Sequence, residues 1–148
     1  MKRITVAAMA ALVASGAVLA AGPFDPIRGK MKEGMYEYKI DMDMPGMPGG
    51  MGKHSTTVQH CVTAKDIEAG DFAKGDKNPG NCQVKDMKAS GSTADYKMVC
   101  TDPEMTSDNH IVFRDNGFAM DSKTSMKQQG QVMNMSQHME GKYIGPCK

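Results

Sequence analysis

The sequence predicts an all-β domain of about seven mainly antiparallel strands and one short helix. At least four segments alternate polar with apolar residues at a period of two, which is the pattern of strands with one buried face. Short stretches rich in Gly, Pro, Asn or Ser separate these segments and favour turns. We therefore expect an up-and-down meander that forms a curled sheet, a half-barrel or a small barrel. An odd number of strands cannot close with every pair antiparallel, so the sheet should be open or imperfectly closed.

The first 20 residues have the form of a secretory signal peptide. Positive charges at positions 2–3 precede an apolar run at 4–17, and Val18-Leu19-Ala20 presents small residues where a signal peptidase cleaves. The run is too short and too rich in Ala for a membrane span, and no second run of membrane length follows. We expect a bacterial periplasmic protein with an irregular segment, 21–33, and a single β domain, 34–148.

The first strand is expected from Tyr36 to Met44. One of its faces carries Tyr36, Tyr38, Ile40, Met42 and Met44, and the other carries Glu37, Lys39, Asp41 and Asp43. Residues 45–50 contain two Pro and three Gly, so they should form a turn or loop. A weaker second strand covers residues 53–62.

One short helix is expected after the second strand. Thr63 should be its N-cap and Asp66 its N3 residue, in a shortened capping box. The helix can continue only to about Ala69, because Gly70 follows. Residues 71–81 are polar and contain Gly and Pro, which predicts a surface loop.

Alternation and turn residues predict the remaining strands. The expected segments are a hairpin of 82–89 and 93–100, a polar connection at 101–109, a short strand at 110–114, and longer strands at 118–127 and 132–143.

Composition excludes nucleic acid as a partner and indicates a small core. The formal net charge is +1, and positive and negative residues are interspersed, so no basic stripe could follow a phosphate backbone. The chain has no Trp and only 5% aromatic residues, but it has 16 Met. Met is flexible and polarizable, so the core should be adaptable.

All four cysteines lie in the expected mature chain, and an even number in an oxidising compartment predicts two disulfides. The sequence contains no CxxC motif, so a zinc site or a redox pair of cysteines is not favoured. Cys82 and Cys100 begin and end one hairpin, so they should lie opposite each other. Cys61 would then pair with Cys147 and attach the C-terminal tail to the second strand. Spacing alone also allows the rival pairs Cys61–Cys82 and Cys100–Cys147.

Several segments together resemble the bacterial domain-of-unknown-function family 3617, whose members are small exported proteins of proteobacteria. The segments are GMYEYKIDMDMPGMP, TTVQHCVT and MEGKYIGPC, and the resemblance extends from about Lys30 to Lys148. Tyr36 stands where the family often carries Trp. The resemblance implies export and a β architecture, and it carries no established activity or catalytic residues.

Methionine and histidine suggest a copper site as one hypothesis. Thioethers are soft ligands that select Cu(I) or Ag(I), and Met47, Met51 and His54 lie in or beside a loop where burial does not explain them. His138 stands among Met133, Met135 and Met139 in sequence, but it falls on the opposite face of its strand. The other interpretation of the methionines is that they pack a core.

A second hypothesis is that an apolar ligand or lipid binds a Met-rich inner face of the sheet. The residues expected on this face are Met42, Met44, Met98, Met120, Met126, Met133, Met135 and Met139. Alternatively, these strands pack only on one another or on the short helix.

Enzymatic activity is the least favoured class. No GxSxG, P-loop or HExxH motif occurs, and the four histidines show no carboxylate or nucleophile partner in the sequence. His60 could activate Cys61, but a disulfide would consume that sulfur. We expect a non-enzymatic periplasmic binding or envelope-accessory module without a cofactor. Its partner would be an apolar small molecule, a lipid or an envelope protein.

Overall fold

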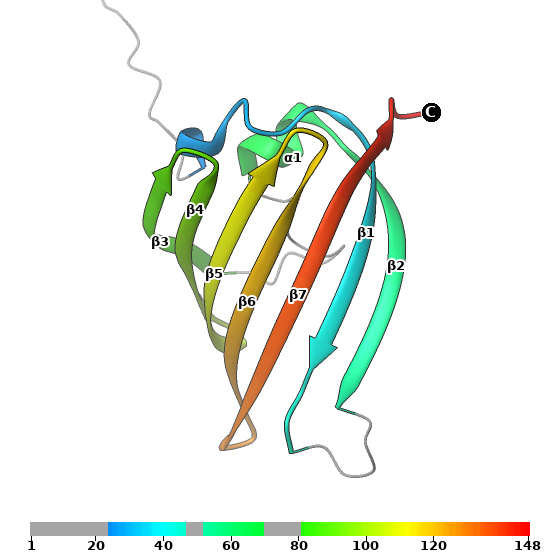
Figure 1. Cartoon of the computed structure of the whole chain (residues 1–148). Helices are drawn as coiled ribbons and strands as arrows, with labels where there is room; N and C mark the ends of the chain where they lie inside the picture. The colour runs from blue at the N-terminus through cyan, green and yellow to red at the C-terminus, as the bar shows by residue number, and fades with distance from the viewer. Residues whose placement is uncertain (1–23, 47–51, 70–80) are drawn as a thin grey trace, which may run out of the picture.

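The computed structural model describes residues 24–46, 52–69 and 81–148. In these residues seven antiparallel strands form one open sheet, accompanied by one short α-helix and a 3-10 turn (Figure 1). The all-β prediction is therefore confirmed. The elements are η1 (Asp25–Ile27), β1 (Gly34–Asp43), β2 (Lys53–Val62), α1 (Ala64–Ala69), β3 (Cys82–Ser90), β4 (Thr93–Thr101), β5 (Glu104–Arg114), β6 (Gly117–Gln128) and β7 (Gln131–Gly145). The signal peptide predicted at residues 1–20 lies outside the described residues.

The two open edges of the sheet are β2 and β3. The strands that come first and last in the chain, β1 and β7, pair with each other. The strand order is β2-β1-β7-β6-β5-β4-β3, so β1 pairs with both β2 and β7. Because every pair is antiparallel, β2 and β3 run in the same direction at opposite edges. The chain that joins these two edges begins with α1.

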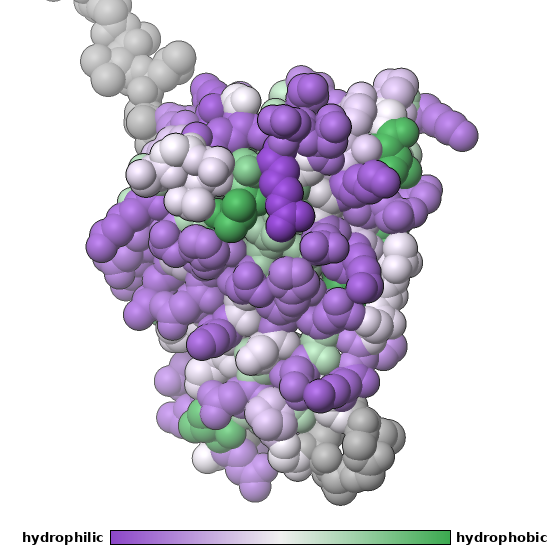
Figure 2. Space-filling view, viewed as in Figure 1, coloured by the Kyte–Doolittle hydropathy of each residue, from purple (hydrophilic) through white to green (hydrophobic). Residues whose placement is uncertain are grey.

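The two faces of the sheet differ in character. The core face carries Tyr36 and Tyr38 of β1, their β7 partners Tyr143 and Gly141, and Phe118, the β6 partner of Gly141. It packs against η1 and α1, which lie at the same end of the sheet in Figure 1. The outer face carries the charged residues of the same strands and is mostly hydrophilic in Figure 2. Side chains alternate between the two faces because successive residues of a strand point in opposite directions.

The closed part of the core lies at the end of the core face that η1 and α1 cover. Its buried residues are Phe24, Ile27, Met31, Tyr36, Tyr38, Val62, Ile67, Ala94, Tyr96, Ile111, Phe113, Phe118, Met120 and Met139. Six of these are aromatic, so the few rings of the chain are concentrated here. The rings make several direct contacts, for example between Tyr38 and Phe118 at a centroid distance of 5.9 Å.

The segment before β1 belongs to this core. Phe24 meets Tyr96 edge-on with ring centroids 5.6 Å apart, and Ile27 and Met31 are buried. Pro26 stands in the first positions of η1, where its fixed φ suits the turn. The sequence indicated only an irregular segment here, because three buried residues spaced by prolines and glycines show no strand or helix period.

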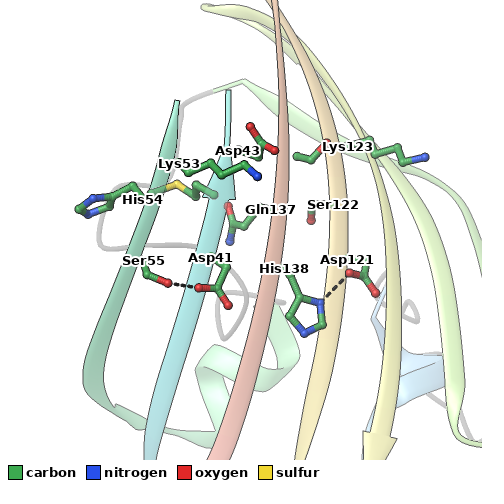
Figure 3. Close-up of a pocket in the computed structure, with 12 residues that line it drawn as sticks. Asp41, Asp43, Lys53, His54, Ser55, Asp121, Ser122, Lys123, Gln137 and His138 are labelled. Carbon is green, nitrogen blue, oxygen red and sulfur yellow. Dashed lines mark hydrogen bonds and ion pairs between the residues drawn. The ribbon is translucent and has the colours of Figure 1, made fainter. Parts of the chain in front are cut away.

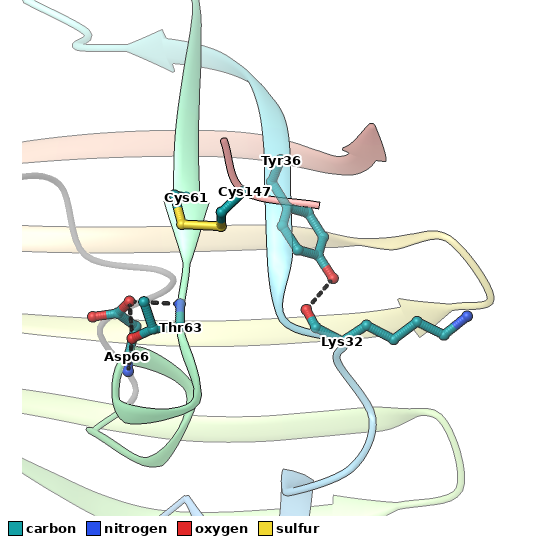
Figure 4. The surroundings of a disulfide bond; sticks show 6 residues. All are labelled: Lys32, Tyr36, Cys61, Thr63, Asp66 and Cys147. Carbon is teal, nitrogen blue, oxygen red and sulfur yellow. Dashed lines mark hydrogen bonds between the residues drawn. A yellow bond between two sulfur atoms is a disulfide. The ribbon is translucent and has the colours of Figure 1, made fainter. Parts of the chain in front are cut away.

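The expected helix and its capping box are present. The Thr63 hydroxyl donates to Asp66 Oδ2 at 2.6 Å, and the Thr63 backbone N–H donates to the same oxygen at 2.7 Å. In return, the Asp66 N–H donates to Thr63 Oγ1 at 3.3 Å (Figure 4). This reciprocal arrangement satisfies N–H groups that the first helical turn leaves free. The same hydrogen bonds hold the pKa of Asp66 below its usual value.

The four cysteines form two disulfides, as their even number predicts. Cys82 and Cys100 are register partners on β3 and β4, with Cα atoms 4.0 Å apart. Cys61 of β2 bonds Cys147 of the C-terminal tail, with Cα atoms 5.5 Å apart (Figure 4). The tail thus crosses β1 to reach the edge strand. The rival pairing is not formed.

One segment that the sequence predicted to be a connection belongs mostly to a strand. Residues 101–109 were expected to form a polar linker, but β5 begins at Glu104 and pairs with β4 through only a two-residue turn. The residues of β5 that face the core here include Ser107 and Asn109, which are polar and buried. A strand whose inward residues are polar shows no apolar alternation, so the sequence pattern missed it.

Candidate functional site

Methionines line the part of the core face that lies away from η1 and α1. We call this part the methionine half, and it consists of Met42, Met98, Met105, Met126, Met133 and Met135. Register places the side chains together, since Met126 pairs with both Met105 and Met133. All but Met133 are half-buried, and Met133 is 41% exposed. Among the described residues, the elements outside the sheet are η1 and α1, and they cover the opposite end of the core face (Figure 1).

Not all of the predicted ligand-face methionines belong to the methionine half. Met120 and Met139 are register partners in the closed core and are only 3% and 4% exposed. Met44 lies just beyond β1, where its N–H donates to the Gly52 carbonyl at 2.6 Å. The structure therefore separates the fully buried methionines from the half-buried ones, and Met98 lies between the two groups because it also packs against the closed core.

A buried polar cluster separates the closed core from the methionine half. Ser122 donates to Asn109 Oδ1 at 2.6 Å, and Asn109 Nδ2 donates to Ser107 Oγ at 2.7 Å. These three side chains are 3–7% exposed and come from the adjacent strands β5 and β6. Gln137, on β7, is the register partner of Ser122 and is half-buried. An apolar surface with a few placed polar groups is the usual composition of a small-molecule site.

Tyr38 brings a second polar group to the core face. Its ring is 4% exposed, and its hydroxyl has no hydrogen-bond partner among the described residues. Burial raises the pKa of Tyr38 and so keeps the hydroxyl neutral. A buried hydroxyl without a partner is costly, so this position favours a water molecule or a polar group of a ligand.

The outer face carries an alternating row of carboxylates and imidazoles. In register order from β4 to β1, the row is Asp95, His110, Asp121, His138 and Asp41. His110 Nδ1 lies 2.6 Å from Asp95 Oδ1, and His138 Nδ1 lies 2.6 Å from Asp121 Oδ1. The expectation that these histidines lack carboxylate partners is therefore wrong. The partners lie on neighbouring strands, and only the register reveals them.

A depression of about 520 Å³ lies at one end of this row. Figure 3 shows Asp121 and His138 joined across β6 and β7, and Asp41 joined to Ser55 across β1 and β2. The residues that line the depression are Asp41, Met42, Asp43, Lys53, His54, Ser55, Asp121, Ser122, Lys123, Ser136, Gln137 and His138. Two imidazoles and three carboxylates share the depression with two lysines, and the side chain of His138 is 44% exposed. Such exposed cross-strand pairs contribute little each and support the sheet.

The structure brings together only part of the predicted copper site. His54 of β2 is the register partner of Met42 of β1, so imidazole and thioether project from neighbouring strands on one face. Met47 and Met51 lie outside the described residues. His138 is on the outer face, whereas Met135 and Met139 are on the core face, so they form no common site.

The described residues contain neither a cluster of metal-ligand side chains nor a membrane-spanning helix. No group of three or more His, Cys, Asp or Glu side chains in residues 24–46, 52–69 and 81–148 is arranged to hold a metal ion. In the same residues, no helix has the length and apolar character needed to span a membrane.

Comparison with known proteins identifies the family. The family model described as a protein of unknown function, DUF3617, matches residues 31–147. The chain belongs to this family. The DUF3617 match spans every strand of the sheet and all four cysteines. The seven-stranded sheet is therefore the fold of the DUF3617 region of this chain. Neither the curated proteins nor the solved structures gave a match to this DUF3617 chain.

Proposed function

We propose that this chain is a non-enzymatic periplasmic protein that binds an apolar or amphipathic small molecule, or a lipid, on the methionine half of its sheet. The single observation that carries the proposal is the set of half-buried methionines, which lie in register on neighbouring strands beyond the closed core. Unbranched thioether side chains adapt to ligands of varied shape. The two disulfides suit an oxidising compartment.

The neighbouring polar groups favour an amphipathic ligand over a purely apolar one. Asn109, Ser122 and Gln137 border the methionines at the end nearest the closed core. An acyl chain or ring system would lie on the methionines, and its polar end would meet this border. Burial of the apolar part would supply most of the binding free energy, at about 25 cal/mol per Å².

A fluorescent fatty-acyl probe tests the proposal on delipidated protein. Met126→Gln combined with Met135→Gln keeps the side-chain size but adds polar atoms to the methionine half, so binding should weaken at least roughly tenfold. Met35→Gln is the matched control, because Met35 pairs with Cys61 on the outer face and is also half-buried. Equal binding by both variants would refute the proposed site.

The second candidate function is Cu(I) or Ag(I) binding near the end of the β1–β2 hairpin. The observation that favours it is the Met42–His54 register pair, which is near the expected ligands Met47 and Met51 in the chain. Met42→Leu removes the thioether but keeps an apolar side chain, so it should weaken Cu(I) binding. His54→Gln should also weaken Cu(I) binding, whereas His60→Gln, on the same face of β2, should not.

A further inference from the structure

The two edges of the sheet differ in their protection against pairing with another strand. In β3 the register with β4 shifts between Lys85 and Lys88, and Asp86 between them has a positive φ of 54°. A bulge and lysines on an edge strand are features that prevent edge-to-edge pairing. β3 is therefore a blocked edge.

β2 has no bulge, and its only lysine is its first residue, Lys53. Its ten residues pair with β1 without a register shift, and no strand among the described residues pairs with its other side. From His54 to Val62 the strand contains no Pro, Gly, Lys, Arg, Asp or Glu. Thr56, Thr57 and Val58 favour extended backbone. Such an edge offers unpaired N–H and C=O groups to an incoming strand.

We propose that β2 pairs with the β2 strand of a second copy of this chain, antiparallel about a two-fold axis at Val58. In such a pair, residues equally spaced from the axis face each other, so a charge at the axis would face its own copy and a charge beside the axis would lie close to its own copy. The charge-free run of β2 is centred on Val58, and this composition suits self-pairing. The two sheets would then form one continuous sheet across the dimer.

Val58 provides an apolar contact at this axis. It is 45% exposed and lies on the core face, because its partner on β1 is Tyr38. The two copies of Val58 would lie directly opposite each other, and Thr56 would face His60 of the other copy. A cross-strand pair of β-branched side chains stabilises an antiparallel ladder. The partner thus covers an apolar side chain that the monomer leaves half in water.

Sedimentation of the purified full chain as a function of concentration tests the proposal. We expect a concentration-dependent dimer for the natural sequence. Val58→Lys places two lysines at the axis and should raise the dimer dissociation constant at least roughly tenfold, whereas Val58→Thr keeps a β-branched residue and should change it much less. A chain that is monomeric at every concentration, or a Val58→Lys dimer as stable as the Val58→Thr dimer, would overturn the proposal.

Disulfide trapping tests the register independently. Val58→Cys in the folded chain should form a covalent dimer on mild oxidation, because the two sulfurs meet at the axis. Ser90→Cys, on the blocked edge strand β3, is the control and should remain monomeric. Equal cross-linking at both positions would show random collision and would contradict the pairing through β2.

Discussion

Phe118 and Gly141 are register partners on β6 and β7, and the ring of Phe118 occupies the space that a side chain at Gly141 would need. A Cβ atom added to Gly141 would lie 2.4 Å from Phe118 Cε1 and 2.8 Å from Cζ. Tyr38, the β1 partner of Gly141, lies against the same ring with a centroid distance of 5.9 Å. The glycine therefore allows two aromatic rings from strands on either side of β7 to meet in the closed core.

Gly141→Ala should lower the free energy of unfolding by about 1–3 kcal/mol, because the ring of Phe118 is buried and packs against the rings of Tyr36 and Tyr38. Chemical denaturation measures this change. Adding Phe118→Leu to Gly141→Ala should recover part of the loss relative to the sum of the two single variants. Simple additivity would show that the clash is not with Phe118.

Tyr38→Phe should leave the free energy of unfolding of the ligand-free protein unchanged or raise it by as much as about 1 kcal/mol. The substitution removes a buried hydroxyl that has no partner among the described residues, so its desolvation cost disappears while the ring contacts remain. Thermal and denaturant unfolding of the delipidated variant measure the effect. A clear loss of stability would mean that the hydroxyl makes a hydrogen bond in the folded chain.

Alkaline pH should destabilise the fold through the buried tyrosines. Burial raises the pKa of Tyr96 from 10.0 to about 12 and also raises that of Tyr36. Because the folded state favours the neutral phenol, the stabilisation is fully present below pH 10.0 and is lost as the pH rises through about 12. Denaturant unfolding at several alkaline pH values should show this slope. Tyr96→Phe should reduce it, and an unchanged slope would contradict the assignment.

The capping box should stabilise the fold at neutral pH but not in strong acid. Asp66 accepts hydrogen bonds from Thr63 that lower its folded-state pKa below the ordinary 3.8. Its contribution is present above pH 3.8 and is lost as the pH falls through the lower folded value. Asp66→Asn should therefore cost about 0.5–1 kcal/mol at neutral pH, and the difference from the natural chain should vanish in strong acid. Thr63→Ser keeps the cap and should cost little; a loss as large as that of Asp66→Asn would argue against this role.

The sequence predicted those elements whose inward residues are apolar or whose ends carry specific turn and cap residues. β1 shows clear alternation, Thr63 and Asp66 mark the helix start, and Cys82 and Cys100 face each other as the hairpin requires. These features depend on residues close together in the chain. Local pattern and local geometry are sufficient for them.

Other features depend on which strands become neighbours. The pairing of β1 with β7 brings His138 beside Asp41, and the pairing of β6 with β7 brings it beside Asp121. Neither contact has a local sequence signal. Similarly, Ser107 can face inward only because Asn109, two residues along β5, satisfies it, and Asn109 is itself held by Ser122 of β6. The polar cluster and the full length of β5 therefore required the three-dimensional arrangement.

Native mass spectrometry of the protein purified from the cells that make it tests the proposed ligand site most directly. We expect an added mass of an organic molecule on the natural chain and on the Met35→Gln control, and its loss from the chain with Met126→Gln and Met135→Gln. The same added mass should disappear after extraction with organic solvent. A natural chain that carries no organic molecule, and whose melting temperature a fatty-acyl probe does not raise, would contradict ligand binding by the methionine half.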